Sequence, residues 1–223
     1  MKCLLCGKNN IPKINFSSLF LIKEKSLCNE CLKMLDKVEG GCIYCGKKTS
    51  ERICDDCLYW QKKIQIPVIN YSLYYYNNYA KDFMKKFKFL GDVALINVFS
   101  NDIKEFFKKF KNKNYYLVPI PLHEERLLQR GFNQSLILAQ MINFPILNIL
   151  RKNNNEKQSK KKKIDRILLD NQYSLLDNNI DLQKKKIIII DDIYTTGATI
   201  HKVARVLMRK KVSNILSFTL FRG

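Results

Sequence analysis

The stretch from Ile187 to Ile200 leaves this chain few ways to fold, because four consecutive isoleucines precede two aspartates and a threonine-rich segment. Four β-branched residues in a row predict a strand buried on both faces, as the inner strands of a parallel sheet are. The segment from His201 to Lys211 has apolar residues at helical spacing, so a helix is expected next. A strand, a loop and a helix in this order indicate an α/β sheet whose ligand binds outside the carboxyl end of the strand.

The threonine-rich segment has the composition of a phosphate-binding loop. Successive backbone N–H groups in a tight turn before a helix form an anion-binding nest, and the helix dipole adds to the attraction. Gly197 permits a left-handed or crowded backbone at this point, and threonine hydroxyl groups can add donors. The candidate phosphate-binding residues are therefore Thr195, Thr196, Gly197, Ala198 and Thr199.

Asp191 and Asp192 stand before this loop, where the strand is expected to leave the sheet. Two carboxylates repel a phosphate, so they are expected to meet a group that donates hydrogen bonds, such as a vicinal diol. Phosphate at the loop and a diol at the acids together describe a ribose 5-phosphate. A simpler alternative makes the loop a helix cap and the aspartates ordinary acids at a strand end. The complete string of motifs favours the ligand site.

These residues resemble the signature with which type I phosphoribosyltransferases bind 5-phosphoribosyl 1-diphosphate (PRPP). The resemblance implies catalytic positions for Asp191 and Asp192, which would hold the ribose hydroxyls. It also implies that the segment from Thr195 to Thr199 holds the 5-phosphate, with Mg²⁺ accompanying PRPP. The loop is not of the Walker A type, because the chain contains no G-x-x-x-x-G-K-[ST] string.

All eight cysteines lie before residue 58, in four C-x-x-C pairs. In a cytosolic protein this spacing indicates zinc rather than disulfides, and eight thiolates suit two tetrahedral sites. Glycine follows the first and third pairs and leucine follows the second and fourth, which favours two consecutive ribbons over an interleaved arrangement. Structural zinc is expected, since so short a segment hardly folds without it. The two expected ligand sets are Cys3, Cys6, Cys28 and Cys31, and Cys42, Cys45, Cys54 and Cys57.

Between these regions, strand and helix patterns alternate. Strands are expected at 68–76, 115–121, 146–150 and 214–221, and helices at 79–89, 93–110 and 133–142, with Asn133 as an N-cap. The glycine-containing stretch after Pro121 is expected to be a loop in which Arg126 and Arg130 clamp a pyrophosphate, since guanidinium groups match phosphate oxygens. His123 is a further candidate there, although a single histidine in a loop is more often a bystander.

The order Pro-x-Pro-Leu-His, then Arg, then Arg-Gly-Phe-Asn-Gln from Pro119 to Gln134 is similar to the ComF family of competence-associated proteins. The stretch from Lys86 to Asp92 also resembles that family's lysine-rich entry to its second domain. The resemblance covers nearly the whole chain. It implies an α/β type I phosphoribosyltransferase-like fold at 66–223, with a central mostly parallel sheet flanked by helices, behind a double zinc ribbon at 1–65.

The resemblance also implies a flexible hood over the site, in which Gln158 and Arg166 match family positions. The chain departs from the family where lysines replace Gly-Leu-Ser-type residues, which favours contact with a polyanion over a tight hood. A solvated loop is the alternative. The candidate DNA-contact residues are Lys160, Lys161, Lys162 and Lys163.

The net charge of +20 invites a nucleic acid as partner, although the lysine, asparagine and isoleucine content also fits the bias of an AT-rich genome. No apolar run approaches the ~18 residues that span a bilayer, and Met1–Cys3 lacks a signal-peptide core. A cytoplasmic location without membrane insertion is therefore expected.

Two functions stay open at this point. The family's link to natural transformation implies a module that binds PRPP or a phosphoribosyl group and handles single-stranded DNA, with competence or DNA-processing proteins as possible partners. An active phosphoribosyltransferase, which passes ribose 5-phosphate from PRPP to an acceptor, is the alternative. No residue of the sequence identifies that acceptor.

Overall fold

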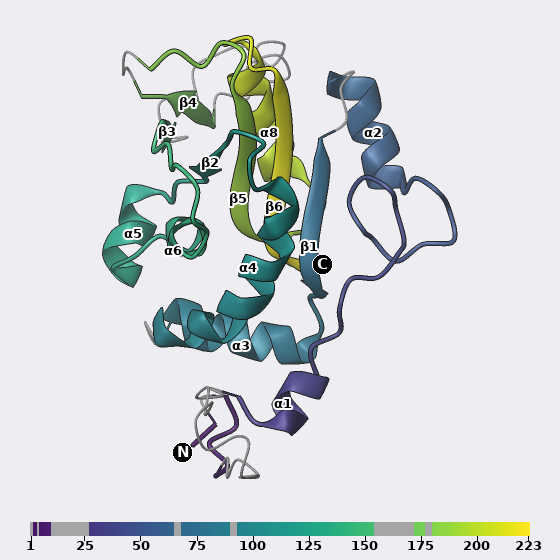
Figure 1. The fold of residues 1–223 in the computed structure, drawn as a ribbon, viewed down its shortest axis with the longest axis vertical. Coiled ribbons are helices and arrows are strands. Elements are labelled where there is room, and N and C mark those ends of the chain that lie inside the picture. Colours follow the sequence, from purple (N-terminus) through teal and green to yellow (C-terminus); the bar gives the residue numbers. More distant parts are fainter. Residues whose placement is uncertain are drawn as a thin grey trace, which may run out of the picture.

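The structure is a computed structural model that describes residues 2–3, 5–9, 27–64, 68–89, 93–153, 172–176 and 180–223, with only the backbone at 89, 93 and 94. Its centre is a four-stranded sheet in which every neighbouring pair is parallel. The order across the sheet is β1 (Ile69–Tyr75), β6 (Asn214–Arg222), β5 (Lys186–Tyr194) and β2 (Tyr115–Pro119) (Figure 1). β5 is thus an inner strand. Ile187 to Ile190 are at most 1% exposed, which confirms the prediction for this run.

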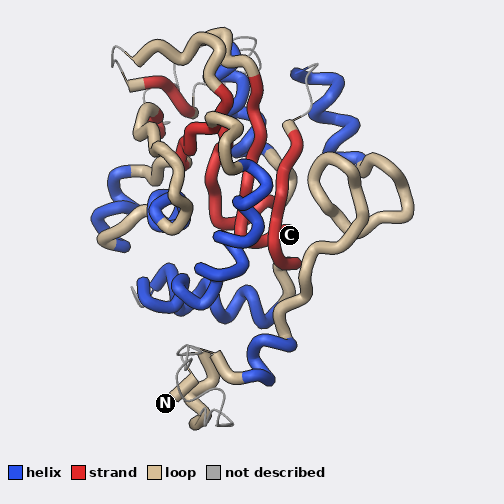
Figure 2. Tube along the Cα trace, in the orientation of Figure 1, coloured by secondary structure: helices blue, strands red, loops and turns tan. Residues whose placement is uncertain are grey.

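Helices cover both faces of the sheet (Figure 2). Ile188 and Ile190 pack into an apolar cluster with α3 (Asn78–Phe89), α4 (Ser100–Phe107) and α6 (Gln134–Gln140). Ile187 and Ile189 pack into a second cluster with α8 (Ala198–Met208). Alternate residues of a strand face opposite sides of a sheet, so the two clusters are its two core layers. The fold is an α/β, type I phosphoribosyltransferase-like fold, as predicted.

The cysteine-rich region lies against the edge strand β1 and includes α1 (Asn29–Lys33) and α2 (Asp55–Ile64). The Val38 amide donates to the Leu73 carbonyl at 3.0 Å, and the Tyr75 amide donates to the Asp36 carbonyl at 2.7 Å. These bonds satisfy backbone groups that an open sheet edge leaves unpaired. Residues 65–67 lie outside the described residues, so the division at 65/66 stays a prediction.

Two expected elements differ from the observed ones. The stretch at 93–110 is not one helix but the 3₁₀ helix η2 (Val93–Phe99), α4, and the 3₁₀ helix η3 (Lys108–Phe110). The strand expected at 146–150 is wrong, because Ile146 makes only an isolated parallel bridge to Leu117. The chain then enters β3 (Leu150–Lys152), which pairs antiparallel with β4 (Tyr173–Leu175) outside the main sheet. A short apolar run does not distinguish the period of a helix from that of a strand. In these two stretches, tertiary contacts therefore determine the secondary structure.

Candidate functional site

The two aspartates of the site lie within β5 rather than beyond its end, because the strand pairs with β6 as far as Tyr194. The expectation that the strand leaves the sheet at the acids is therefore wrong by a few residues. Asp191 Oδ1 accepts a hydrogen bond from Ser135 Oγ at 3.0 Å and another from the Asp192 amide at 2.9 Å. Ser135 stands in the first turn of α6, which Asn133 caps as predicted by accepting from two amides. The capped helix thus fixes one acid.

Asp192 forms an ion pair with Lys88 near the end of α3, with 2.6 Å between Oδ2 and Nζ. The two side chains are 15% and 20% exposed, so solvent screens this pair less than a surface pair. Lys88 belongs to the lysine-rich stretch noted in the sequence, but its pairing with the acid was not foreseen. The ammonium group of Lys88 therefore provides a positive charge at the candidate site.

The environment of Asp191 favours its neutral form. The pKa of Asp191 is raised to about 7, mainly by loss of hydration and also by the charge of Asp192. The hydrogen bonds from the Asp192 amide and Ser135, and the charge of Lys88, oppose this shift. Such pKa values are typical of functional sites, where acids are held partly dehydrated beside a second charge.

Arg130, one of the two arginines expected to bind pyrophosphate, interacts electrostatically with Asp192. Burial lowers the pKa of Arg130, the charge of Arg126 adds to this, and the charge of Asp192 opposes it. These two arginines lie on the short helix α5 (Glu124–Arg130) and not in a loop, which corrects that expectation. Gly131 ends α5 in the left-handed conformation, at φ 75°. His123 precedes the helix, with Nδ1 3.9 Å from Glu125 Oε2.

A third cation, Lys152, lies at the end of β3 and interacts electrostatically with Asp191. Burial lowers its pKa, the charge of Arg126 adds to this, and the charge of Asp191 opposes it. The acid pair therefore interacts with three cations, Lys88, Arg130 and Lys152, which come from three different elements. Such an arrangement attracts an anion that also carries hydroxyl groups for the acids.

The candidate phosphate loop directly follows β5 and leads into α8. Thr195 and Thr196 are exposed, whereas Gly197 is buried with φ 79°. A Cβ atom at Gly197 would lie 2.2 Å from Tyr194 Oη, so glycine is required both by conformation and by space. Helix geometry leaves the N–H groups of Ala198 and Thr199, the first residues of α8, without intrahelical acceptors. The predicted loop thus leads into a helix N-terminus, where free N–H groups and the helix dipole attract anions. Its binding of phosphate stays a prediction.

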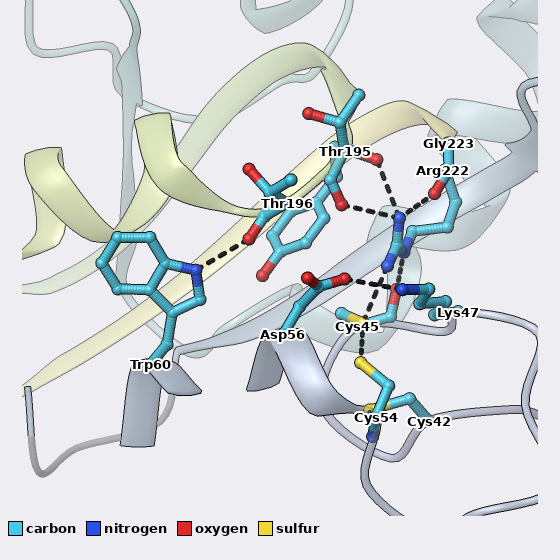
Figure 3. Close-up of polar contacts among 11 residues, drawn as sticks. Cys42, Cys45, Lys47, Cys54, Asp56, Trp60, Thr195, Thr196, Arg222 and Gly223 are labelled. Carbon is cyan, nitrogen blue, oxygen red and sulfur yellow. Dashed lines mark hydrogen bonds and ion pairs between the residues drawn. The ribbon is translucent and has the colours of Figure 1, made fainter. Parts of the chain in front are cut away.

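The loop's carbonyl groups are held by residues that the sequence did not single out (Figure 3). Arg222 Nη1 donates to the carbonyls of Tyr194 at 3.1 Å and Thr195 at 2.9 Å. Trp60 Nε1, on α2, donates to the Thr196 carbonyl at 2.7 Å. The indole ring stacks on His201 of α8, with ring centroids 4.7 Å apart.

The cysteines form two groups in the consecutive order, and the Sγ atoms of each group lie within 4.8 Å of one another. Either group could hold a metal ion, and four thiolates are the donor set of structural zinc. Arg222 is 1% exposed, and its Nε and Nη2 lie 2.9 Å from the Cys45 carbonyl and 3.2 Å from Cys45 Sγ. A buried guanidinium requires a nearby negative charge, which a thiolate group provides. The second group therefore fits a zinc tetrathiolate.

Other parts of the chain bear on the site less directly. The hood candidates Gln158 and Arg166 and the lysines at 160–163 lie outside the described residues, so their roles stay predictions. A cavity of about 690 Å³ opens between the segment at 37–46, β1 and α4, away from the acid pair. Among the described helices, none has the length and apolar character needed to cross a membrane.

The parallel sheet, the acid pair and the glycine-bearing helix start define a domain of the phosphoribosyltransferase class, and the phosphoribosyl transferase domain family matches residues 127–223. The chain is 40% identical to competence protein ComFC of Bacillus subtilis, over 99% of this chain and 95% of that protein. It is 35% identical to ComFC of Streptococcus pneumoniae over both full lengths. It is 25% identical to competence protein F of Haemophilus influenzae, over 91% and 93% of the two chains. The chain therefore belongs to the ComF family of competence proteins.

Proposed function

We propose that this protein binds PRPP, or the phosphoribosyl end of a nucleotide, and handles single-stranded DNA in natural transformation. The observation that carries the proposal is the acid pair of β5, enclosed by cations and followed directly by the helix start at Gly197. Asp191 and Asp192 would accept hydrogen bonds from the ribose hydroxyls. The loop from Thr195 to Thr199 would bind the 5-phosphate through backbone N–H and hydroxyl groups.

The diphosphate of PRPP would lie toward α5. Arg130 interacts electrostatically with Asp192 and with Arg126, so we expect both arginines near the bound sugar. Guanidinium groups bind phosphate oxygens in pairs. Mg²⁺, when bound with PRPP, neutralises part of the diphosphate charge. Arg126 and Arg130 would then orient the diphosphate.

The same arginines favour one alternative, an active phosphoribosyltransferase. Breaking the bond between C1 and the diphosphate requires the leaving group's charge to be stabilised, and Arg126 and Arg130 would supply this stabilisation. Release of diphosphate from PRPP in the presence of a panel of bases and amines tests this activity. A turnover that Arg130→Lys reduces strongly would establish the enzyme, whereas no release with any acceptor would leave the binding module.

Two zinc ions would hold the cysteine-rich region, which we place at 1–65 ahead of the phosphoribosyltransferase-like region at 66–223. Each four-cysteine group offers four thiolate donors and no open position. The expected role is structural. Metal analysis of the purified protein should give two zinc ions per chain.

Single-stranded DNA would bind through lysines, of which the block from Lys160 to Lys163 is the densest. Affinity should fall steeply with salt, because each neutralised phosphate contributes a slope of about 0.7 in log K against log salt. Changing the four lysines to glutamine should therefore reduce the slope by up to about 3. An unchanged slope would place the DNA contact elsewhere.

The ligand site is tested by calorimetric titration with PRPP, with and without Mg²⁺. The wild type should bind, and more tightly with Mg²⁺, whereas a variant with Asp191→Asn and Asp192→Asn should lose binding and stay folded. Asp82→Asn on the exposed side of α3 is the matched control and should bind as the wild type does. Undiminished binding by the double variant would refute the assignment.

A further inference from the structure

Three consecutive peptide groups at the start of the phosphate loop have their carbonyls held by hydrogen bonds. The Tyr194 carbonyl accepts from Arg222 and from the Gly223 amide, and the Thr195 carbonyl accepts from Arg222. The Thr196 carbonyl accepts from Trp60 at 2.7 Å. No described peptide bond is cis, and in a trans peptide the N–H group points opposite to the carbonyl. The N–H groups of Thr195, Thr196 and Gly197 therefore point away from Arg222 and Trp60.

The third of these peptide groups, between Thr196 and Gly197, is the one that can rotate most easily. It precedes Gly197, and glycine adopts positive and negative φ with similar ease. Rotation of this peptide group would exchange the positions of the Thr196 carbonyl and the Gly197 N–H. A carbonyl oxygen would then face the bound phosphate and repel it. The hydrogen bond from Trp60 Nε1 opposes this rotation.

Both residues that hold these carbonyls are linked to the second cysteine group. Trp60 lies one turn after Cys57 on α2, and its ring is fixed by stacking on His201. Arg222 is anchored by the carbonyl and Sγ of Cys45, at 2.9 and 3.2 Å, as Figure 3 shows. The first cysteine group instead packs in the apolar cluster with α3. The second group is therefore linked to the residues that hold the phosphate loop, whereas the first group contributes to the apolar core.

We infer that Trp60 is a positioning residue for the phosphate loop, and that the second cysteine group orients the loop's N–H groups through Trp60 and Arg222. This inference rests on the proposed PRPP site. It gives the second metal group a role in ligand binding in addition to its role in folding. The indole does not touch the ligand in this account. It acts through the Thr196 carbonyl alone.

The test compares Trp60→Phe with Tyr59→Phe. Phenylalanine can stack on His201 but cannot donate to Thr196. Tyr59 is 50% exposed, meets Trp60 edge to face and lies under the Lys63 ammonium group, which a phenylalanine ring can also accept. Trp60→Phe should weaken PRPP and ribose 5-phosphate about threefold to tenfold, the range for one hydrogen bond. It should leave pyrophosphate binding at Arg126 and Arg130, the zinc content and the melting temperature unchanged. Tyr59→Phe should change none of these quantities.

The chain provides a second readout, because Trp60 is its one tryptophan. PRPP with Mg²⁺ should shift the intrinsic fluorescence of the wild type and leave that of the Asp191→Asn, Asp192→Asn variant unchanged. Equal ribose 5-phosphate affinity in Trp60→Phe and wild type would overturn the inference and leave the PRPP site standing. Equal weakening of pyrophosphate would also overturn it, since Trp60 would then be merely structural. No binding of PRPP by the wild type would overturn the proposed function and this inference together.

Discussion

Lys88 Nζ lies 2.6 Å from Asp192 Oδ2, so the end of α3 is joined to β5 at the candidate ribose position. Among the described residues, Asp191 has no such ion-pair partner, and it instead accepts hydrogen bonds from Ser135 and the Asp192 amide. Neighbouring carboxylates repel one another, and a resident lysine lowers the cost of that repulsion before any ligand arrives. The two acids therefore differ in their partners: Asp192 is neutralised by a lysine, and Asp191 accepts hydrogen bonds.

Replacing Lys88 by methionine should destabilise the protein and weaken PRPP. Asp192 would lose its partner, which should cost about 1–2 kcal/mol, between the values for exposed and buried ion pairs. Lys85→Met, at an exposed position of the same helix, should cost far less. Urea unfolding measures both effects. Equal losses for the two variants would contradict a special role for Lys88.

Asp191 should make stability and ligand binding change in opposite directions with pH. Its pKa is raised to about 7 in the fold, against about 3.9 in an unfolded chain. The folded state then holds more protons between about pH 4 and pH 7, so the contribution of Asp191 to the free energy of unfolding falls as pH rises through that window. PRPP binding should strengthen over the upper part of the window, because the carboxylate is the better acceptor.

The measurement for this prediction is the difference between the wild type and Asp191→Asn. Urea unfolding of both proteins at several pH values between about 5 and 8 should show a wild-type advantage that shrinks as pH rises. Titrating groups that do not interact with Asp191 cancel in the difference. A difference independent of pH would mean that Asp191 is ionised throughout.

Two left-handed glycines offer a matched pair for the geometry of the loop. Gly197→Ala places Cβ 2.2 Å from Tyr194 Oη, whereas a Cβ at Gly131 meets no atom within 4 Å. Gly131→Ala should cost about 1–2 kcal/mol from conformation alone. Gly197→Ala should cost about 3–5 kcal/mol, because overpacking adds to conformation. Similar losses of unfolding free energy for both variants would show that the loop tolerates displacement.

Removing one cysteine from each group should separate the roles of the two groups. Cys6→Ser and Cys54→Ser should each lower the zinc content from two ions to one, as measured by native mass spectrometry. Cys54→Ser should weaken PRPP more strongly, because its group contacts Arg222 and carries α2. A larger effect of Cys6→Ser on PRPP would contradict this difference between the groups.

Local patterns were sufficient for the elements of the site. The isoleucine run predicted an inner strand, Asn133 predicted the start of α6, and the C-x-x-C repeat predicted which cysteines gather together. Each of these rests on neighbouring residues in the sequence. The stretch around Arg126 was predicted as a loop because a nearby glycine was given more weight than helical residues, and Gly131 in fact ends a helix.

Local sequence patterns could not predict the contacts between distant segments. Trp60 and Thr196 are 136 residues apart, and Arg222 and Cys45 are 177 apart. Nothing in the sequence around Arg222 distinguishes it from a solvated arginine at the end of a chain. Only the folded arrangement of the cysteine-rich region against β1 and α8 brings these residues to the loop.

The most direct test of the account is a crystal structure of the protein with PRPP and Mg²⁺. The account predicts the ribose hydroxyls at the carboxylates of Asp191 and Asp192 and the 5-phosphate at the N–H groups from Thr195 to Thr199. PRPP bound elsewhere, for example in the cavity beside β1, with the acid pair still closed on Lys88 and Ser135, would contradict it.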